Sequence, residues 1–151
     1  MSTTPLEARI RRLEDREAIR DLARQYAHCV WQHDIAGAVA LFAEDGVMDT
    51  GDRAPLRGRA AILETYTEAL SDAVFQPFVH NHVVSVRGDE AEGTCYLDLR
   101  QTRDGRSYIG SGYYEDRYRR IEGAWKFQSR KLVLSYLVPL TEGWAETQAE
   151  D

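Results

Sequence analysis

The sequence predicts an α+β fold, with helices in the first half of the chain and an antiparallel sheet in the second. Near residue 78 the spacing of apolar residues changes from three- and four-residue steps to alternation, which marks the passage from helices to strands. The length of 151 residues, with 43% apolar and 29% charged residues, is typical of one globular domain. We expect this domain to span residues 1–151, with a loose polar tail after about residue 140.

Three helices are expected before the sheet. The first covers residues 6–33, because apolar residues recur there at helical spacing and no Gly or Pro interrupts them. Asp34 is placed as the N-cap of a second, short helix, which ends at residues 44–46 and leads into a short strand at residues 47–50. The third helix is expected over residues 58–71.

Four longer strands follow, in which apolar and polar residues alternate. On the first of them, Phe78, His80 and His82 share the expected inner face, and on the second Leu99 and Gln101 share it. The expected strands cover residues 78–86, 94–101, 108–120 and 125–138, with turns at 87–90, 103–106 and 122–123.

Composition excludes several classes of partner. Acidic residues outnumber basic ones by 25 to 19, and the net charge of −6 repels the phosphate backbone of nucleic acids. The apolar runs are too short to span a membrane, and residues 1–12 lack the apolar segment of a secretory signal. Cys29 and Cys95 do not form a CxxC pair, which favours reduced thiols and a cytoplasmic protein.

No cofactor and no metal are expected from the motifs. The sequence contains no GxGxxG or P-loop pattern for a nucleotide. His28, His33 and Asp34 are close in sequence, but no further ligand has the spacing of a zinc site.

Five segments, in this order and spacing, resemble the SnoaL-like branch of the NTF2-like superfamily. They are residues 16–22 (REAIRDL), 33–45 (HDIAGAVALFAED), 86–91 (VRGDEA), 112–118 (GYYEDRY) and 123–127 (GAWKF). The branch includes scytalone dehydratase, dehydrochlorinases and relatives of ketosteroid isomerase. The resemblance covers about residues 6–139 and implies an NTF2-like cone, in which three N-terminal helices and a curved antiparallel sheet enclose one apolar pocket.

The resemblance also implies where a catalytic pair would stand. The dehydratases and dehydrochlorinases of this group use an Asp near the end of the first helix and a His on a strand. Those positions fall here on Trp31 and on Gln76 or Pro77, and a second histidine of scytalone dehydratase falls on Gln101. This chain therefore either catalyses with other groups or does not catalyse.

Four residues are candidates for acid–base chemistry in the pocket. His80 is the expected base, because an imidazole on the inner face exchanges protons near neutral pH, and His82 or Asp49 would support it. Tyr114 is expected to donate a hydrogen bond to an oxygen on which negative charge develops. The structural alternatives are hydrogen-bonded core histidines, a solvated Asp49 at a strand end, and Tyr114 as core packing.

The remaining candidates bind the substrate. Trp31 offers an indole face to a flat ring, which points to an aromatic or polycyclic compound. Asp116 either orients Tyr114 or a histidine, or pairs with an arginine such as Arg130. The basic cluster of this region is expected mostly to point to solvent; it consists of Arg117, Arg119, Arg120, Arg130 and Lys131. The side chains expected to meet in one cavity are Trp31, Phe78, His80, Leu99, Gln101 and Tyr114, with Tyr26 at its wall or in the core.

The function that these residues favour is that of a cofactor-independent lyase or isomerase acting on a hydrophobic aromatic or polycyclic small molecule. Dehydration, elimination, a double-bond shift and C–C cleavage are the candidate reactions. The alternatives are a binding or sensing module and a small subunit of an oxygenase-type assembly. Both alternatives are expected to move ahead of the enzyme if His80 and Tyr114 lie on opposite faces of the sheet. Val83, Tyr96 and Tyr113 are expected to face outward, which predicts a homo-oligomer, a dimer or a trimer.

Overall fold

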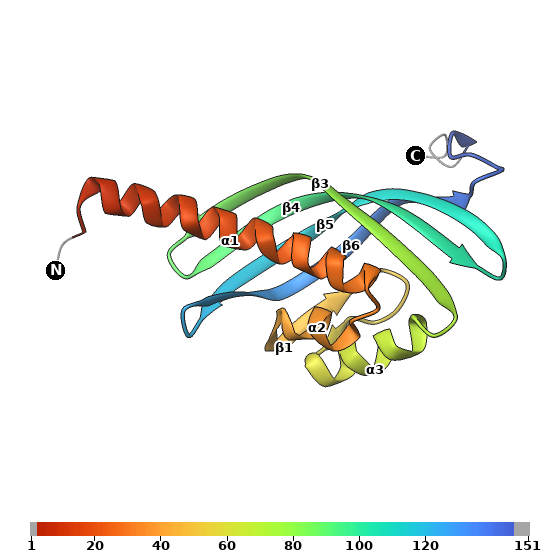
Figure 1. Ribbon diagram of the computed structural model, residues 1–151, viewed down its shortest axis with the longest axis horizontal. Helices are drawn as coiled ribbons and strands as arrows, with labels where there is room; N and C mark the ends of the chain where they lie inside the picture. Colours follow the sequence, from red (N-terminus) through yellow and green to blue (C-terminus); the bar gives the residue numbers. More distant parts are fainter. Residues whose placement is uncertain (1–2, 147–151) are drawn as a thin grey trace.

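The structure is a computed structural model that describes residues 3–146. Three helices, α1 (Pro5–Trp31), α2 (Ile35–Ala40) and α3 (Arg59–Ala69), pack on a curved, unclosed sheet (Figure 1). The strands are β1 (Phe42–Asp49), β2 (Leu56–Arg57), β3 (Ala73–Arg87), β4 (Glu90–Arg103), β5 (Arg106–Ile121) and β6 (Ala124–Pro139). The α+β class predicted from the sequence is confirmed. Within residues 3–146, no helix is both long enough and apolar enough to cross a membrane.

The sheet is mixed, with strand order β2-β1-β6-β5-β4-β3. Strands β3 to β6 form the expected antiparallel meander, whose turns fall where the sequence predicts them. In the β4–β5 turn, Asp104 and Gly105 both have positive φ, 51° and 72°, as a tight two-residue hairpin requires. The prediction of a wholly antiparallel sheet is wrong in one place, because β1 pairs parallel to β6, a strand far from it in sequence.

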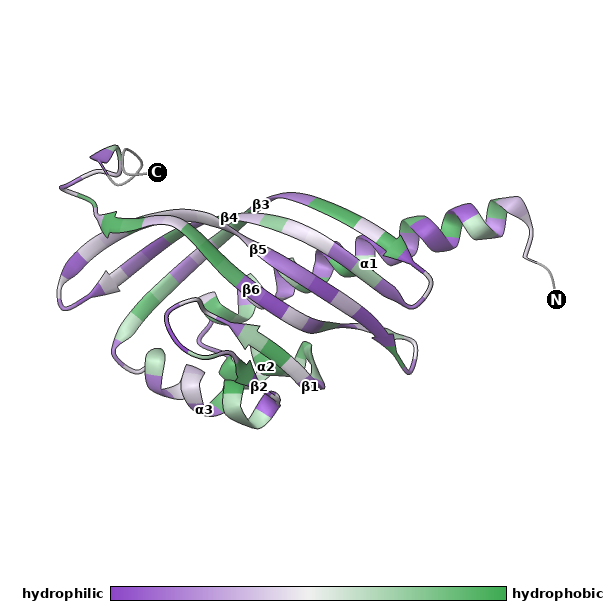
Figure 2. Ribbon diagram, turned by 180° about the vertical axis from the view of Figure 1, so that it is seen from behind, coloured by the Kyte–Doolittle hydropathy of each residue, from purple (hydrophilic) through white to green (hydrophobic). Residues whose placement is uncertain are grey.

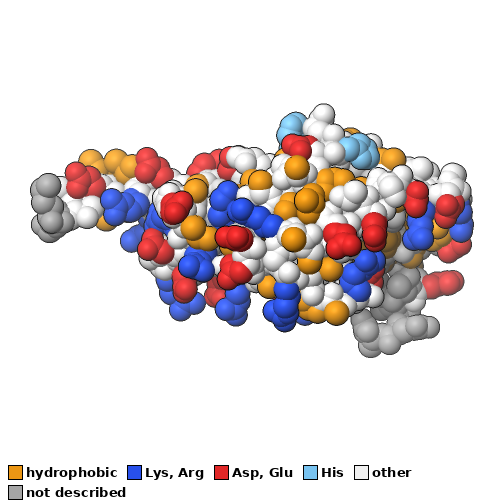
Figure 3. Space-filling view, turned by 90° about the horizontal axis from the view of Figure 1, so that it is seen from below, with side chains coloured by type: hydrophobic (Ala, Val, Ile, Leu, Met, Phe, Trp, Pro, Cys, Tyr) orange, Lys and Arg blue, Asp and Glu red, His pale blue; other side chains and the backbone are white. Residues whose placement is uncertain are grey.

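Helix α1 lies across the sheet. It begins at a capping box, in which the Thr4 hydroxyl accepts a hydrogen bond from the Glu7 amide at 3.1 Å and the Glu7 carboxylate accepts one from the Thr4 amide at 3.0 Å. The side of α1 that carries Ile19 and Tyr26 packs on the sheet and forms much of the core. The first turns project beyond the sheet (Figures 1 and 3), and the helix ends at Trp31, slightly before the expected boundary. Figure 3 also shows acidic and basic side chains interleaved over the underside of the molecule.

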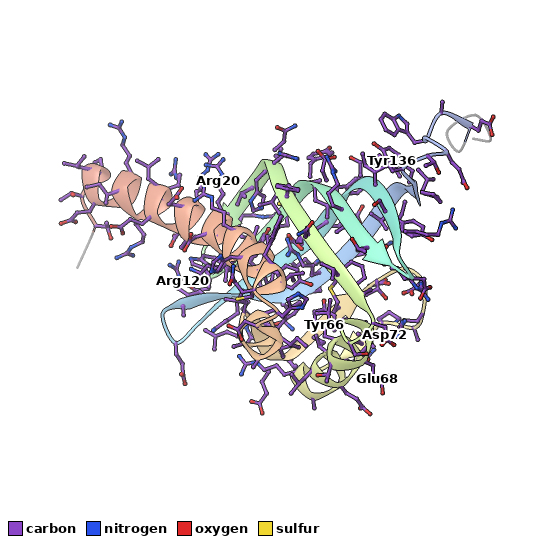
Figure 4. All side chains as sticks on the ribbon, turned by 45° about the vertical axis from the view of Figure 1, so that its right-hand side comes forward. Arg20, Tyr66, Glu68, Asp72, Arg120 and Tyr136 are labelled. Atoms are coloured by element: carbon purple, nitrogen blue, oxygen red, sulfur yellow. The ribbon has the colours of Figure 1, made fainter. Side chains whose placement is uncertain are left out.

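A network around Arg120 fastens α1 to the sheet (Figure 4). The Arg120 guanidinium contacts Asp15 of α1 at 2.6 Å and Asp89 of the β3–β4 turn at 2.8 Å, and it lies over the Trp125 ring at 4.8 Å. The indole of Trp125 also donates to Asp15 at 3.1 Å. Arg120 therefore has a structural role. The expectation that it points to solvent as part of a basic face is wrong, because it pairs with Asp15 and Asp89.

The second helix and the first strand divide differently from the prediction. Helix α2 ends at Ala40, and Phe42 already begins β1, paired with Phe127 of β6. Residues 44–46, expected to form a turn, instead lie within β1, where the register shifts between Phe42 and Val47. The strand pairing is irregular at this point, so the polar residues and the glycine that predicted a turn fit within the strand. The two-residue strand β2 was not predicted.

A register shift in β3 exchanges the faces of its side chains. Val79 pairs with Leu97 and His82 pairs with Cys95, so one extra residue lies between them on β3. His82 therefore shares the inner, helix-covered face with Cys95, whereas His80 falls on the opposite face. The prediction that Phe78 and His80 share the inner face with His82 is wrong for this reason. Figure 2 shows hydrophilic and hydrophobic residues alternating along these strands.

A second shift, in β6, brings a charged residue into the core. Phe127 pairs with Tyr118 and Ser129 pairs with Arg117, so the extra residue on β6 is Gln128. Beyond it the inward positions change parity, and Arg130 faces the core with a fully buried side chain. The expectation that Arg130 points to solvent is therefore wrong.

Candidate functional site

The predicted cavity does not assemble. Tyr114 is buried under α1, whereas His80 lies on the other face of the sheet, where its Nε2 is 2.9 Å from Asp98 Oδ2 in a half-exposed pair. The β3 register shift separates the two residues that were expected to act together. Asp49 also lies elsewhere: its carboxylate accepts a hydrogen bond from the Gly51 amide at 2.9 Å, as a residue entering a loop does.

Trp31 and Phe78 form a contact at the edge of the sheet. The Trp31 indole donates to the carbonyl of Pro77 at 2.7 Å, and its ring meets Phe78 edge-on with centroids 5.3 Å apart. The two residues are 37% and 42% exposed, so they do not line a closed pocket. Leu99 and Gln101 are buried on the inner face, as predicted, whereas the exposed Phe78 lies on the other face of the sheet.

The centre of the inner face holds a buried ion pair. Arg130 donates to Asp116 from Nε at 2.9 Å and from Nη2 at 3.1 Å, and both side chains are 0% exposed. Burial opposes the charge of Arg130, but the neighbouring carboxylate outweighs burial and the pKa of the guanidinium is raised. The alternative in which Asp116 pairs with Arg130 is confirmed.

Aromatic rings enclose this guanidinium. Its Cζ lies 3.6 Å from the centroid of Tyr114, 4.4 Å from Phe127 and 4.6 Å from Tyr26. The Tyr26 hydroxyl in turn lies 2.6 Å from the hydroxyl of Tyr66 on α3, which is labelled in Figure 4. Burial raises the pKa of Tyr26, Tyr66 and Tyr114, so all three phenols stay protonated. Tyr114 therefore packs in the core and supports Arg130.

A hydrogen-bonded relay runs outward from this ion pair to His82. The Tyr118 hydroxyl donates to Asp116 Oδ2 at 2.9 Å, and His82 Nε2 lies 2.8 Å from the same hydroxyl oxygen. Because a phenol has one proton, Tyr118 accepts from His82, which places the imidazole proton on Nε2. The lone pair of His82 is then on Nδ1, which makes no hydrogen bond within residues 3–146.

His82 borders a cavity of about 340 Å³ between α1 and β3. Burial lowers the pKa of His82 to about 4, so the imidazole is neutral at pH 7 and its Nδ1 is free to accept a proton. Burial also raises the pKa of Cys95 to about 11, which leaves a thiol rather than a nucleophilic thiolate. The lining residues are Arg20, Ala23, Arg24, Val79, His80, His82 and Cys95.

Sequence reasoning missed Tyr118, Arg20 and Arg24. Tyr118 follows Asp116 by two residues, so strand alternation could have placed it on the same face. Arg20 and Arg24 are four residues apart on α1, which puts them on one side of the helix. Among residues 3–146, no group of three or more His, Cys, Asp or Glu side chains is arranged to hold a metal ion.

The comparisons with known proteins agree with this architecture. The family model of the SnoaL-like domain matches residues 11–131. No curated protein matches the chain significantly.

Several solved structures share the fold. One, described as a proposed aromatic ring hydroxylase from Novosphingobium aromaticivorans, is 30% identical, covers 86% of this chain and 96% of its own, and has a TM-score of 0.79. A hexachlorocyclohexane dehydrochlorinase from Novosphingobium barchaimii is 20% identical over 87% of this chain and 94% of its own, with a TM-score of 0.80. A proposed scytalone dehydratase from N. aromaticivorans is 21% identical over 84% of this chain and 88% of its own, with a TM-score of 0.77.

Proposed function

This chain belongs to the SnoaL-like domain family, and on that premise we propose that it is a cofactor-independent lyase or isomerase acting on a small molecule between α1 and β3. The observation that carries the proposal is the imidazole of His82, which borders the cavity and whose proton is held on Nε2 by Tyr118. Proton abstraction requires a base with an available lone pair beside a space of small-molecule size.

The reaction follows from the relay. His82 takes a proton at Nδ1 from a carbon next to an electron-withdrawing group. The electron pair left on that carbon expels a leaving group from its neighbour in an elimination, or shifts a double bond in an isomerisation. The imidazolium keeps its Nε2 hydrogen bond to Tyr118, whose proton is in turn held by Asp116. Return of the Nδ1 proton to the leaving group or to the new carbon restores neutral His82.

The substrate is proposed to carry an aromatic or polycyclic body. Ala23 and Val79 give the cavity an apolar wall against which such a body packs. The related structure with 30% identity is described as a proposed aromatic ring hydroxylase, which supports the same class of compound. The likeness to a dehydrochlorinase and to a proposed dehydratase supports elimination as the reaction type.

Turnover by matched histidine variants tests the proposal. The wild-type protein, His82→Gln and His28→Gln are incubated with aromatic β-hydroxy and β-halo ketones, and product is followed by mass spectrometry. His28 is an exposed residue of α1 outside the cavity, so His28→Gln should retain the wild-type rate. Loss of the base should lower turnover by ~10²–10⁴-fold in His82→Gln. Equal turnover by wild type and His82→Gln would remove His82 from the mechanism.

A binding or sensing module is the second candidate. It is favoured by the placement of His80 and Tyr114 on opposite faces of the sheet, the outcome under which the alternatives to the enzyme are expected to move ahead. It is also favoured by Trp31 and Pro77, which bond to each other at positions where the resemblance implies a catalytic pair. A compound that raises the melting temperature but is recovered unchanged after long incubation would decide for binding without chemistry. Co-purification with a larger subunit would instead favour the oxygenase-type assembly.

A further inference from the structure

Arginines follow one side of α1 at four-residue steps beside β3. Arg20 and Arg24 border the cavity (Figure 4 labels Arg20), and Arg16 precedes them by one turn. Arg20 makes no ion pair or side-chain hydrogen bond within residues 3–146. Arg24 meets only Glu17, at 2.6 Å, in a pair whose side chains are 52% and 64% exposed.

This arrangement leaves Arg20 at the cavity without a paired carboxylate, and Arg24 with only an exposed partner on its own helix. Arg20 and Arg24 lie four residues apart on the helix, where like charges repel each other. None of the residues that line the cavity is acidic. In a protein of net charge −6, such a group of donors fits an anionic ligand.

We propose that the cavity between α1 and β3 binds the carboxylate of a small aromatic acid through the guanidinium groups of Arg20 and Arg24. This names the substrate class for the site proposed above and rests on that function for its catalytic meaning. The planar guanidinium presents paired N–H donors that match the two oxygens of a carboxylate. A volume of about 340 Å³ suits a single small molecule, whose ring would pack on Ala23 and Val79.

Binding of the carboxylate also acts on His82. Burial is the main cause of its low pKa, and the charges of Arg130, Arg20 and Arg24 lower the pKa further, whereas Asp116 raises it. A carboxylate between the two α1 arginines offsets their charge, and the pKa of His82 rises. An acidic substrate therefore strengthens the base that acts on it, and an uncharged analogue does not.

Benzoate and benzamide form the matched pair of probes, since they share a ring and differ in charge. Their binding is measured by calorimetry for the wild type, for Arg20→Gln/Arg24→Gln, and for Arg9→Gln as a control on the same helix outside the cavity. The double variant should fold, because it removes only one exposed ion pair. We expect wild type and Arg9→Gln to prefer benzoate over benzamide, and the double variant to bind benzoate at least ~10-fold more weakly.

The outcomes separate this inference from the proposed function. Equal affinity for benzoate and benzamide would overturn the site. A loss of benzoate affinity in Arg9→Gln equal to that in the double variant would also overturn it. Inorganic phosphate that binds as tightly as benzoate would overturn the assignment of the site to a carboxylate. Histidine NMR gives a second readout: benzoate should move the titration of His82 upward from about 4 in the wild type and in Arg9→Gln, but not in the double variant. Benzoate binding that depends on both arginines but is followed by no turnover of any aromatic acid supports the anion site and counts against the lyase.

Discussion

The indole nitrogen of Trp31 lies 2.7 Å from the carbonyl oxygen of Pro77, so the end of α1 is bonded to β3 where the resemblance places an acid–base pair. The contact itself is an N–H···O=C bond, which holds the helix end against the strand and transfers no proton in a reaction. The base proposed for this chain is therefore a different residue of β3, His82, on the helix-covered face.

Restoring the acid alone should not restore the chemistry. In Trp31→Asp the carboxylate would face Gln76 and Pro77, neither of which exchanges protons, so we expect no gain in chloride release from hexachlorocyclohexane over the wild type. Loss of the Trp31 hydrogen bond and ring contact should lower the melting temperature by a few degrees. Chloride release is followed by ion chromatography, with Trp144→Asp as a control at an exposed indole. Faster release by Trp31→Asp alone would contradict this account.

The low pKa of His82 predicts how stability depends on pH. The pKa is about 4 in the folded protein, because of burial, and 6.5 is the ordinary value that the unfolded chain should show. Between these values the unfolded state binds more protons at this site, so the free energy of unfolding falls as the pH is lowered from about 6.5 to about 4. Urea unfolding at several pH values measures the fall.

His82→Gln should lose this part of the pH dependence, whereas His28→Gln, changed at an exposed position, should keep it. The comparison isolates His82 from carboxylates that titrate in the same range. A wild-type curve that coincides in slope with His82→Gln from pH 6.5 to 4 would show that the imidazole is not held neutral by burial.

Removing the buried carboxylate should be far more costly than removing an exposed one. Asp116→Asn leaves the charge of Arg130 buried without its partner, and we expect a loss of about 3–5 kcal/mol in the free energy of unfolding. Asp98→Asn breaks only the half-exposed contact with His80 and should cost about 0–1 kcal/mol. Urea denaturation of both variants at pH 7 makes the comparison, and similar losses in the two would contradict the central role of the Asp116–Arg130 pair.

The sequence predicts the order of elements because helical and alternating periods differ strongly. It does not predict which face His80 or Arg130 occupies, because a single extra residue in a strand reverses every inward position beyond it. The extra residues lie between Val79 and His82 in β3 and at Gln128 in β6, and neither segment carries a glycine that would signal a bulge. Alternation predicts both His80 and His82 as candidates; both border the cavity, and His82 is the one whose side chain lies on the helix-covered face.

The ion pair between Asp116 and Arg130 is difficult to predict from the sequence for a second reason. In the sequence Arg130 stands next to another basic residue, Lys131, and nothing local marks it as the buried one. Its burial, its ion pair with Asp116 and its packing against aromatic rings become visible only in the structure. Such burial depends on a carboxylate from another strand arriving at the right register, which no single segment specifies. Asp116 and Arg130 are directly paired across β5 and β6, so the shift at Gln128 determines both their meeting and their burial.

The outer face of the sheet predicts self-association. Val83 is 66% exposed and Tyr96 is 43% exposed, with the Tyr96 ring 5.7 Å from that of Tyr113, so the outward placement of these residues is as expected. Apolar and aromatic side chains grouped on an open sheet face are typical of an interface, and a stable one should bury ~1,000 Å² or more. We expect a dimer or trimer in sedimentation velocity at micromolar concentration. Val83→Lys should shift it to the monomer by placing charge in the contact, whereas Leu63→Lys, at an exposed apolar position on α3, should not. A wild-type protein that sediments as a monomer at that concentration would show that this face is not an interface between copies of the chain.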